Sequence, residues 1–414
     1  MMKDEERFSI YMAMDGPHLD GLIGSAGILR FDWPERAFYI QHYDGISAAH
    51  NVSVSPNGML ALLGNFSQQL VLLDISNPER MPVVARQATQ YFEDCLYRLR
   101  SNTHHLWYPD NERFIGAIGD HLYRFHVDRL KEPEQLGPHY LFNAHEIRWD
   151  PSRRYILVGD LGPEHEDARQ IAVFDLEEPD PLKRSKVIKL PGTVWHCCVH
   201  PTKAVGYALT YSFATEQENY VDWSPAYTRE YIFEVDLIDA RISRVWSCGS
   251  EFPIHLNSDV GVTEDNYLYV ACGGSHTVVE ISLDQFDESR VLSCIPPRRT
   301  RARLWRQRGK NLVGAISRRP TLISTHLVTQ TLQVTGGRIL DGVYAARVSP
   351  QGKYLVTGSR GYNVLSVFDR KTFKKLYGKL LPFRKDAYTK EGPHYRLGRR
   401  GYHLGFHHSE VTPR

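Results

Sequence analysis

The sequence predicts an all-β protein that folds as a single β-propeller domain over residues 1–414. A short unit of strands and tight turns recurs along most of the chain. The two ends of the chain carry complementary parts of one further unit, so the repeat can close into a ring. The composition, 42% hydrophobic and 24% charged, is ordinary for a folded globular protein and provides a core of useful size.

Two stretches show the repeat most clearly. In residues 50–74 a strand leads through Ser-Pro-Asn-Gly into a second strand, and a loop leads into a third strand that ends at Asp74. Residues 344–369 repeat this order with Ser-Pro-Gln-Gly and end at Asp369. Proline at the second position of a turn and glycine at its end suit a tight connection. β-branched and aromatic residues alternate in the strands, so each unit predicts one antiparallel blade.

The same unit can be followed, with decreasing clarity, through the rest of the chain. Further copies begin at His104, His145, His196, Asp259 and Ala302, and the last of these is the weakest. With the two clear copies they make seven complete units between about residues 47 and 381. Adding the unit shared by the two termini predicts eight blades. If the weak copy at residues 302–328 is an insertion, the prediction becomes seven.

The termini predict how the ring closes. Residues 8–12, 27–32 and 37–42 look like the second, third and fourth strands of a unit that lacks its first strand. Residues 402–406 look like an isolated strand with no unit of its own. We expect this C-terminal strand to pair with the N-terminal half-blade. Closure in this way leaves only short and protected strand edges.

The turn and strand motifs resemble those of the YVTN and WD40-like propeller superfamily over nearly the whole chain. A true WD repeat would end each third strand with Trp-Asp. This sequence instead has Leu-Leu-Asp74, Val-Phe-Asp175, Glu-Val-Asp236 and Val-Phe-Asp369, so a WD-type scaffold is less favoured. The shared motifs are structural, and the resemblance implies a fold but no activity.

Histidines occur at related places in the units. His50, His145, His196 and His403 each open a first strand, and His255 lies just ahead of another. Because the first strand of a propeller blade is the innermost, these side chains are predicted to ring the mouth of the central channel. Converging neutral imidazoles favour Fe, Mn, Cu or Zn over Mg or Ca. The alternative is that they are buried core histidines, which hydrogen bond within the blades.

The spacing of these histidines sets a condition on the metal site. His50 and His145 lie six residues before the proline of the following turn, whereas His196 lies five before Pro201. One residue of slip reverses the direction of a side chain on a regular strand. A bulge must therefore intervene if His196 is a ligand. The sequence leaves open whether His104 or His105 joins the site.

Other candidate residues come from long loops and from the neighbourhood of the histidines. Glu146 and Tyr344 are candidate acid or base residues, and Arg301 lies in a basic stretch that could hold an anionic substrate. The loop at residues 210–230 carries Tyr220 and Trp223, which suit a lid over an organic substrate. The alternative is a loop that only packs over the rim.

The architecture is similar to that of metal-dependent propeller enzymes, such as the selenium-binding protein/methanethiol oxidase group, the oligogalacturonate lyases and the four-histidine carotenoid oxygenases. This similarity implies a small-molecule enzyme of oxidoreductase or lyase type, with a divalent transition metal and an aromatic or sugar-like substrate. Two alternatives remain. One is a metal-free scaffold that binds protein partners on its rim, and the other is a metal-free lactonase-like or cyclase-like enzyme.

Charge and cysteine content bear on partners and location. Fifty basic and 48 acidic residues give a net charge of +2, which provides no field for nucleic acid or an anionic membrane. No apolar run is long enough to span a membrane, and no signal-peptide core follows the N-terminus. The six cysteines fall at irregular spacing and are expected to be reduced thiols in a cytoplasmic protein. The oligomeric state does not follow from the sequence.

Overall fold

The structure is a computed structural model of the chain. It describes residues 5–15, 26–43, 46, 49–65, 69–89, 102–138, 141–160, 169–213, 228–248, 254, 257–273, 275–285, 289–302, 342–359, 364–381 and 405–414. In this part of the chain, no helix is long and apolar enough to cross a membrane.

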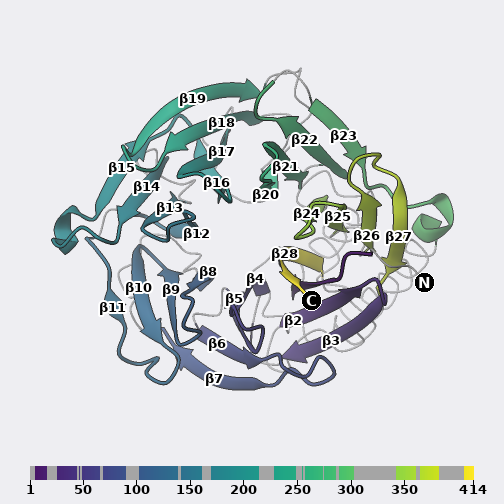
Figure 1. Cartoon of the computed structure of the whole chain (residues 1–414), viewed down its shortest axis with the longest axis horizontal. Helices are drawn as coiled ribbons and strands as arrows, with labels where there is room; N and C mark the ends of the chain where they lie inside the picture. Colours follow the sequence, from purple (N-terminus) through teal and green to yellow (C-terminus); the bar gives the residue numbers. More distant parts are fainter. Residues whose placement is uncertain are drawn as a thin grey trace, which may run out of the picture.

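The described strands form a ring of four-stranded antiparallel blades around a central axis (Figure 1). Each blade runs from an inner strand at the axis to an outer strand at the rim. Blade 1 contains β28 (Gly405–Pro413), β1 (Phe8–Asp15), β2 (Ala26–Trp33) and β3 (Ala37–Tyr43); blade 2 contains β4 (Ala49–Val54), β5 (Leu60–Asn65), β6 (Gln69–Asp74) and β7 (Val83–Ala88); blade 3 contains β8 (Asn102–Trp107), β9 (Arg113–Ile118), β10 (His121–His126) and β11 (Glu134–Gln135).

The remaining blades follow in chain order around the ring. Blade 4 contains β12 (Ala144–Trp149), β13 (Tyr155–Asp160), β14 (Gln170–Asp175) and β15 (Ser185–Lys189); blade 5 contains β16 (Thr193–Val199), β17 (Val205–Phe213), β18 (Thr228–Asp236) and β19 (Arg241–Cys248); blade 6 contains β20 (Asn257–Val262), β21 (Tyr267–Cys272), β22 (Thr277–Ser282) and β23 (Ser289–Ser293); blade 7 contains β24 (Val343–Val348), β25 (Tyr354–Ser359), β26 (Val364–Asp369) and β27 (Lys375–Leu380).

The ring has seven blades, which is the alternative to the count of eight made from the sequence. Each of the seven interfaces between neighbouring blades is filled by its own hydrophobic cluster. Blades 6 and 7 are direct neighbours, because Ser258 Oγ on β20 donates a hydrogen bond to Val343 O on β24 at 2.5 Å. No space for a further blade remains between them. The weak copy of the repeat falls almost entirely within residues 303–341, outside the described residues.

The C-terminal strand closes the ring, as the sequence predicts. β28 pairs with β1 in antiparallel register from Phe8↔Pro413 to Asp15↔Gly405. The paired segment begins three residues later than the predicted strand at 402–406 and extends to Pro413. The inner strand of blade 1 buries polar residues, among them His408 and Ser409, toward the axis. An alternation of apolar residues therefore does not mark this strand in the sequence.

The inner strands share an irregularity close to their first residues. The register of β4 with β5 shifts between Ala49 and Asn51, which leaves His50 out of the ladder. The corresponding shifts leave out His145 in blade 4 and Trp195 in blade 5, and Ser258 and Tyr344 occupy the same position in blades 6 and 7. A bulge of this kind turns the side chain of the extra residue out of the regular alternation.

The four cysteines whose side chains the structure describes agree with the expectation of reduced thiols. Cys197, Cys198, Cys272 and Cys294 are buried and form no disulfide. Burial raises the pKa of both Cys197 and Cys198 above the usual thiol range, so these two side chains are inert core residues at neutral pH.

Candidate metal centre

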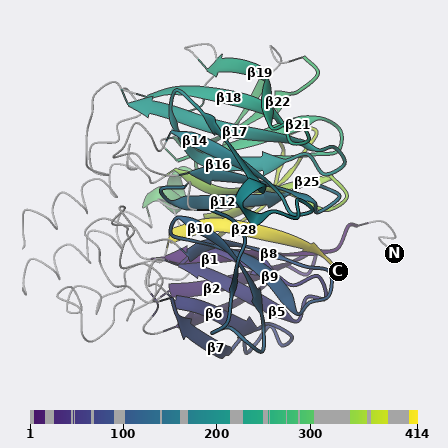
Figure 2. The ribbon, with the colours of Figure 1, turned by 90° about the vertical axis from the view of Figure 1, so that its left-hand side faces the viewer.

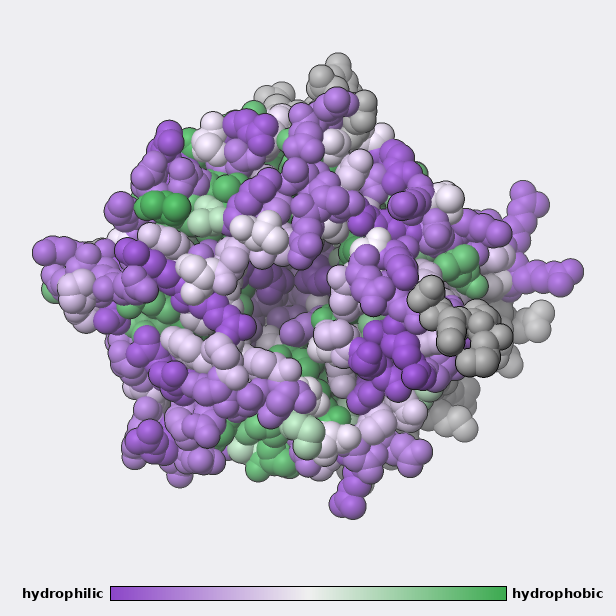
Figure 3. All heavy atoms as spheres, viewed as in Figure 1, coloured by the Kyte–Doolittle hydropathy of each residue, from purple (hydrophilic) through white to green (hydrophobic). Residues whose placement is uncertain are grey.

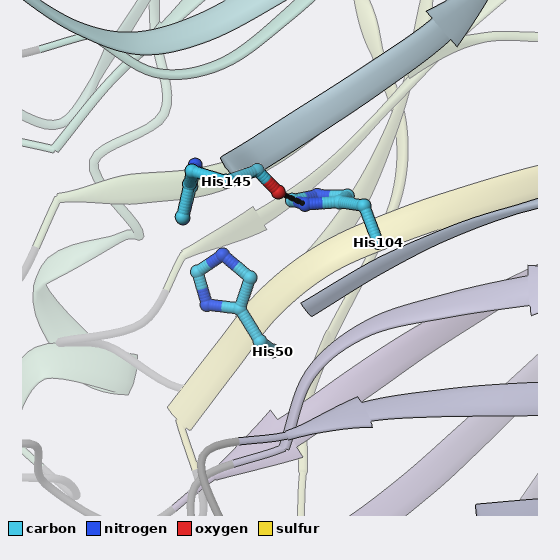
Figure 4. A group of neighbouring side chains, drawn as sticks. All are labelled: His50, His104 and His145. Carbon is cyan, nitrogen blue, oxygen red and sulfur yellow. Dashed lines mark hydrogen bonds between the residues drawn. The ribbon is translucent and has the colours of Figure 1, made fainter. Parts of the chain in front are cut away.

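Three histidines from successive blades meet at the axis of the ring (Figure 4). His50, His104 and His145 lie on the inner strands β4, β8 and β12, and each is at most 1% exposed. One ring nitrogen from each lies within 4.8 Å of the other two. Nitrogens bound to one ion at bonds of about 2 Å lie within about 4 Å of one another. Side-chain shifts of less than about 1 Å would thus bring the three rings onto one ion.

Two further buried imidazoles extend this group. The ring of His408, on β28, has its centroid 4.6 Å from those of both His50 and His196. The ring of His196, on β16, lies 5.8 Å from that of His145. Neither residue is exposed to solvent. We call these five residues, His50, His104, His145, His196 and His408, the histidine cluster.

Hydrogen bonds to backbone carbonyls fix the protonation of His104 and His145, two of the three histidines that meet at the axis (His50, His104 and His145, here called the triad). Nδ1 of His104 donates to the carbonyl oxygen of His145 at 2.6 Å, and Nδ1 of His145 donates to that of Trp195 at 2.9 Å. A carbonyl oxygen can only accept, so each Nδ1 carries the proton. In a neutral ring, the lone pair is then on Nε2. Ligating histidines in metalloproteins are oriented by this kind of bond to a second group.

The ring of His196 is oriented by a hydrogen bond to a carboxylate, that of Glu146. Nδ1 of His196 donates to Oε2 of Glu146 at 2.8 Å, and the backbone N–H of Cys197 donates to the same oxygen at 3.0 Å. Arg148 donates to the other oxygen. Within the described structure, Nε2 of His196 and Nε2 of His104 have no hydrogen-bond partner. These contacts give Glu146 the role of orienting His196, and its predicted role as a catalytic acid or base stays a prediction.

Asp259, on β20, holds the corresponding place in blade 6. Its carboxylate lies 3.5 Å from Nδ1 of His408 and 2.6 Å from Nη1 of Arg347, and it accepts the N–H of Ala346 at 3.0 Å. Asp259 and Glu146 each follow the bulged residue of their inner strand and are completely buried. The histidine cluster is therefore flanked by two carboxylate–arginine pairs.

Burial sets the charge of the cluster. It lowers the pKa of His104, His145 and His196 well below the usual histidine range, and nearby histidines act in the same direction. Neutral imidazole is the form that binds a metal. These three rings are thus neutral, and able to ligate, at neutral and mildly acidic pH.

These pKa shifts predict that the protein without bound metal loses stability as the pH falls below about 6.5. The unfolded chain takes up protons on His104, His145 and His196 there, whereas the folded chain does not. His105, whose pKa burial lowers to about 3, adds to the effect. Each such group lowers the free energy of unfolding by up to about 1.4 kcal/mol per pH unit.

Two buried carboxyls oppose this loss. Burial raises the pKa of Asp160 to about 6 and that of Glu410 to about 7, so the folded chain binds these protons more tightly than the unfolded chain. Four histidines against two carboxyls leave a net loss. Urea unfolding of chelator-treated protein between pH 7 and pH 5 measures it, and an unfolding free energy that stays constant over this range would contradict these protonation states.

The structure brings together only part of the predicted site. His50, His145 and His196 belong to the cluster, and Tyr344 occupies the bulge position of blade 7 with 1% exposure. Arg301 follows Thr300, which lines one pocket together with residues of the outer strand β27, and its predicted role in holding a substrate stays a prediction. The predicted metal ligands His255 and His403 and the predicted loop residues Tyr220 and Trp223 lie outside the described residues.

Two members of the cluster were not among the predicted ligands. His104 opens its strand much as His50 does, and the sequence leaves open only whether it or His105 is used. His105 is buried within its blade and bonds through Nε2 to Asn102 Oδ1 at 2.8 Å. His408 lies on the C-terminal strand, five residues after the predicted ligand His403. The signal in the sequence is the pair His407-His408 within a largely polar segment, which has no alternation of apolar residues.

The chain matches no family model and no curated protein sequence. Among solved structures, it is similar to hydrazine synthase of Kuenenia stuttgartiensis, with a TM-score of 0.53 over 79% of this chain and 78% of that chain. The two sequences are 14% identical over the match, so the likeness shows the propeller fold alone. Fold and site together define a seven-bladed propeller whose buried central histidines could hold a metal ion.

Proposed function

We propose that this protein is a small-molecule enzyme that holds a divalent transition metal ion on the histidine cluster, and that its reaction is of oxidoreductase or lyase type. The observation that carries the proposal is the convergence of His50, His104 and His145 from three blades onto one point of the axis. In the described part of the chain, Nε2 of His104 and Nε2 of His196 are buried without a hydrogen-bond partner, which is costly to the fold unless a ligand uses them. A shared cation uses them.

The donor set fits a transition metal. Imidazole nitrogens suit Zn, Cu and Fe, and the triad contains no carboxylate oxygen of the kind that Mg or Ca prefers. When bound, such an ion supplies Lewis acidity or activates oxygen or water. The chain itself supplies the orientation of the rings, through the carbonyls of His145 and Trp195 and the carboxylate of Glu146. It also excludes bulk water, because all five rings are buried.

The neighbouring residues His104 and His105 provide a matched test. We expect Co²⁺ to bind wild-type protein with ligand-field absorption bands, and His104→Ala to lower the affinity at least about 100-fold because a ligand is lost. His105→Ala removes an equally buried imidazole that bonds to Asn102 instead, so it should lower stability but keep Co²⁺ affinity. Equal Co²⁺ affinity in wild type and His104→Ala would contradict the proposed site.

The proposed enzymatic activity is tested separately from metal binding, by an assay of turnover. Turnover of aromatic and sugar-like substrates should require both the metal and His104, and it should survive His105→Ala in protein that remains folded. A turnover that is the same in His104→Ala and in wild type would favour a metal-free enzyme. Retained binding of a protein partner after loss of the cluster, without any turnover, would favour a scaffold.

A further inference from the structure

We propose that the substrate of this centre is a small organic acid, whose carboxylate is bound by Arg148 with the support of Arg347, on the channel side of the histidine cluster. This inference rests on the proposed function and adds the chemical class of the substrate. Arg148 lies on β12, three residues after His145, and Arg347 lies on β24, three residues after Tyr344. Both thus follow the bulge of their inner strand by the same number of residues.

In both carboxylate–arginine pairs, the arginine side chain is more exposed to solvent than the carboxylate. The carboxylates of Glu146 and Asp259 are completely buried, whereas the side chains of Arg148 and Arg347 are 23% and 14% exposed. Of the two members of each pair, the guanidinium group is therefore the one that a solute can reach. The carboxyl of Glu410, on β28, lies within electrostatic reach of both arginines. The carboxylates hold the guanidinium groups in place, which lowers the cost of ordering them around a ligand.

Arg148 is the better placed donor of the two. Its hydrogen bond to Glu146 uses Nη2 and leaves its other N–H donors for a ligand. Arg347 donates from Nε to Ser409 O and from Nη1 to Val260 O, in addition to its contact with Asp259. It contributes mainly charge. A guanidinium can hold a carboxylate through two parallel hydrogen bonds, which distinguishes an acid from its amide.

The two arginines belong to the same part of the channel although they come from blades 4 and 7. Both lie within electrostatic reach of His196 on blade 5. Gly261, on β20, leaves space beside Arg347, because a Cβ built there would meet Nη1 of Arg347 at 3.8 Å. Figure 3 shows a hollow at the centre of the face where β28 ends, bordered by hydrophilic and some hydrophobic residues, and Figure 2 shows the ring from the side.

The position of the arginines also limits the size of the acid. The histidines lie near the start of the inner strands, and the arginines lie three residues closer to the hollowed face. Side chains bridge most of this offset, because Arg148 and His196 donate to the two oxygens of one carboxylate, that of Glu146. A ligand that contacts both an arginine and the cluster therefore carries its reactive group only a few bonds from its carboxylate, as in an aryl carboxylate or a sugar acid.

The test uses matched acid and neutral probes on the metal-loaded protein. Benzoate and benzamide form one pair, and glucuronate and glucose form the other. We expect at least one acid to bind at least about 10-fold more tightly than its neutral partner, and Arg148→Gln to remove this preference. Arg244→Gln is the control, because Arg244 is paired with Glu234 in the same way but lies on the outer strand β19. It should leave binding unchanged.

The outcomes separate this inference from the proposed function. Co²⁺ binding is measured on the same samples, and Arg148→Gln should retain it. Arg148→Lys, which keeps the charge but loses the paired donors, should bind the acid with intermediate affinity and serves if the glutamine variant does not fold. Equal binding of acids and neutral partners, or an unchanged preference in either Arg148 variant, would overturn the inference while leaving the metal site intact. Failure of wild type to bind Co²⁺ would instead overturn the proposed function.

Discussion

Truncation after residue 404 removes β28 and is expected to prevent the protein from forming a stable ring. β28 is the inner strand of blade 1, and it pairs with β1 over nearly the whole length of that strand. It also contacts the blades on either side, because Glu410 accepts the N–H of Val54 at 2.7 Å and Ser409 accepts a hydrogen bond from Arg347 at 2.9 Å. Its loss exposes unpaired strand edges and opens the core of blade 1.

The expected loss of stability is of the same order as the whole stability of a typical domain, about 5–15 kcal/mol. We therefore expect aggregation, or a melting transition lowered by tens of degrees, in circular dichroism and size-exclusion chromatography. His408→Ala is the control, because it keeps the strand and removes one imidazole of the cluster. It should fold and bind Co²⁺ more weakly. A truncated protein with the melting temperature of wild type would show that β28 does not close the ring.

Glu146→Ala is expected to be the most damaging single substitution around the histidine cluster. It leaves the guanidinium of Arg148, Nδ1 of His196 and the N–H of Cys197 without their shared acceptor in a buried site. Removing one partner of a buried charge pair costs about 3–5 kcal/mol. Urea unfolding measures this cost. Glu134→Ala is the control, since Glu134 pairs with Arg124 at the surface and should cost at most about 1 kcal/mol.

The glutamine variant separates positioning from packing. Glu146→Gln keeps the shape of the side chain and can still accept a hydrogen bond from His196, but it loses the charge that holds Arg148. If Glu146 orients a ligand, Co²⁺ affinity should fall about 10- to 100-fold in folded Glu146→Gln protein. Unchanged Co²⁺ affinity, or a cost below about 1 kcal/mol for Glu146→Ala, would mean that the carboxylate neither orients the site nor pairs with Arg148 as described.

The fold could be predicted best from those units of the repeat that contain a Ser-Pro-x-Gly turn. The Ser-Pro-x-Gly turns and the strands that end in Asp74 and Asp369 lie where the structure has blades 2 and 7. The number of blades was harder to obtain. Residues 302–328 contain strand-like apolar runs, but a blade must also pack against neighbours on both faces. In the structure, blades 6 and 7, between which this further blade would have to lie, are already in contact through Ser258 and Val343.

The candidate site could be predicted only in part, because the spacing of the histidines is visible in the sequence but the bulges of the inner strands are not. His50 and His145 share one spacing to the following turn, and the structure places both at the bulge of their strand. His196 was expected to need a bulge, and one is present at Trp195, the residue before it. A bulge adds one residue without a signal in composition. The sequence alone therefore could not show that Trp195 occupies the position of His50, or that Glu146 orients His196.

The metal content of untagged wild-type protein shows whether the histidine cluster binds a transition metal. The protein should be purified without chelating resin, supplied in turn with Fe, Mn, Cu and Zn, and assayed by elemental analysis together with His104→Ala and His105→Ala. We expect about one transition-metal ion per chain in wild type and His105→Ala, and almost none in folded His104→Ala. Wild-type protein that retains none of the four metals, or His104→Ala protein that retains as much as wild type, would contradict this expectation.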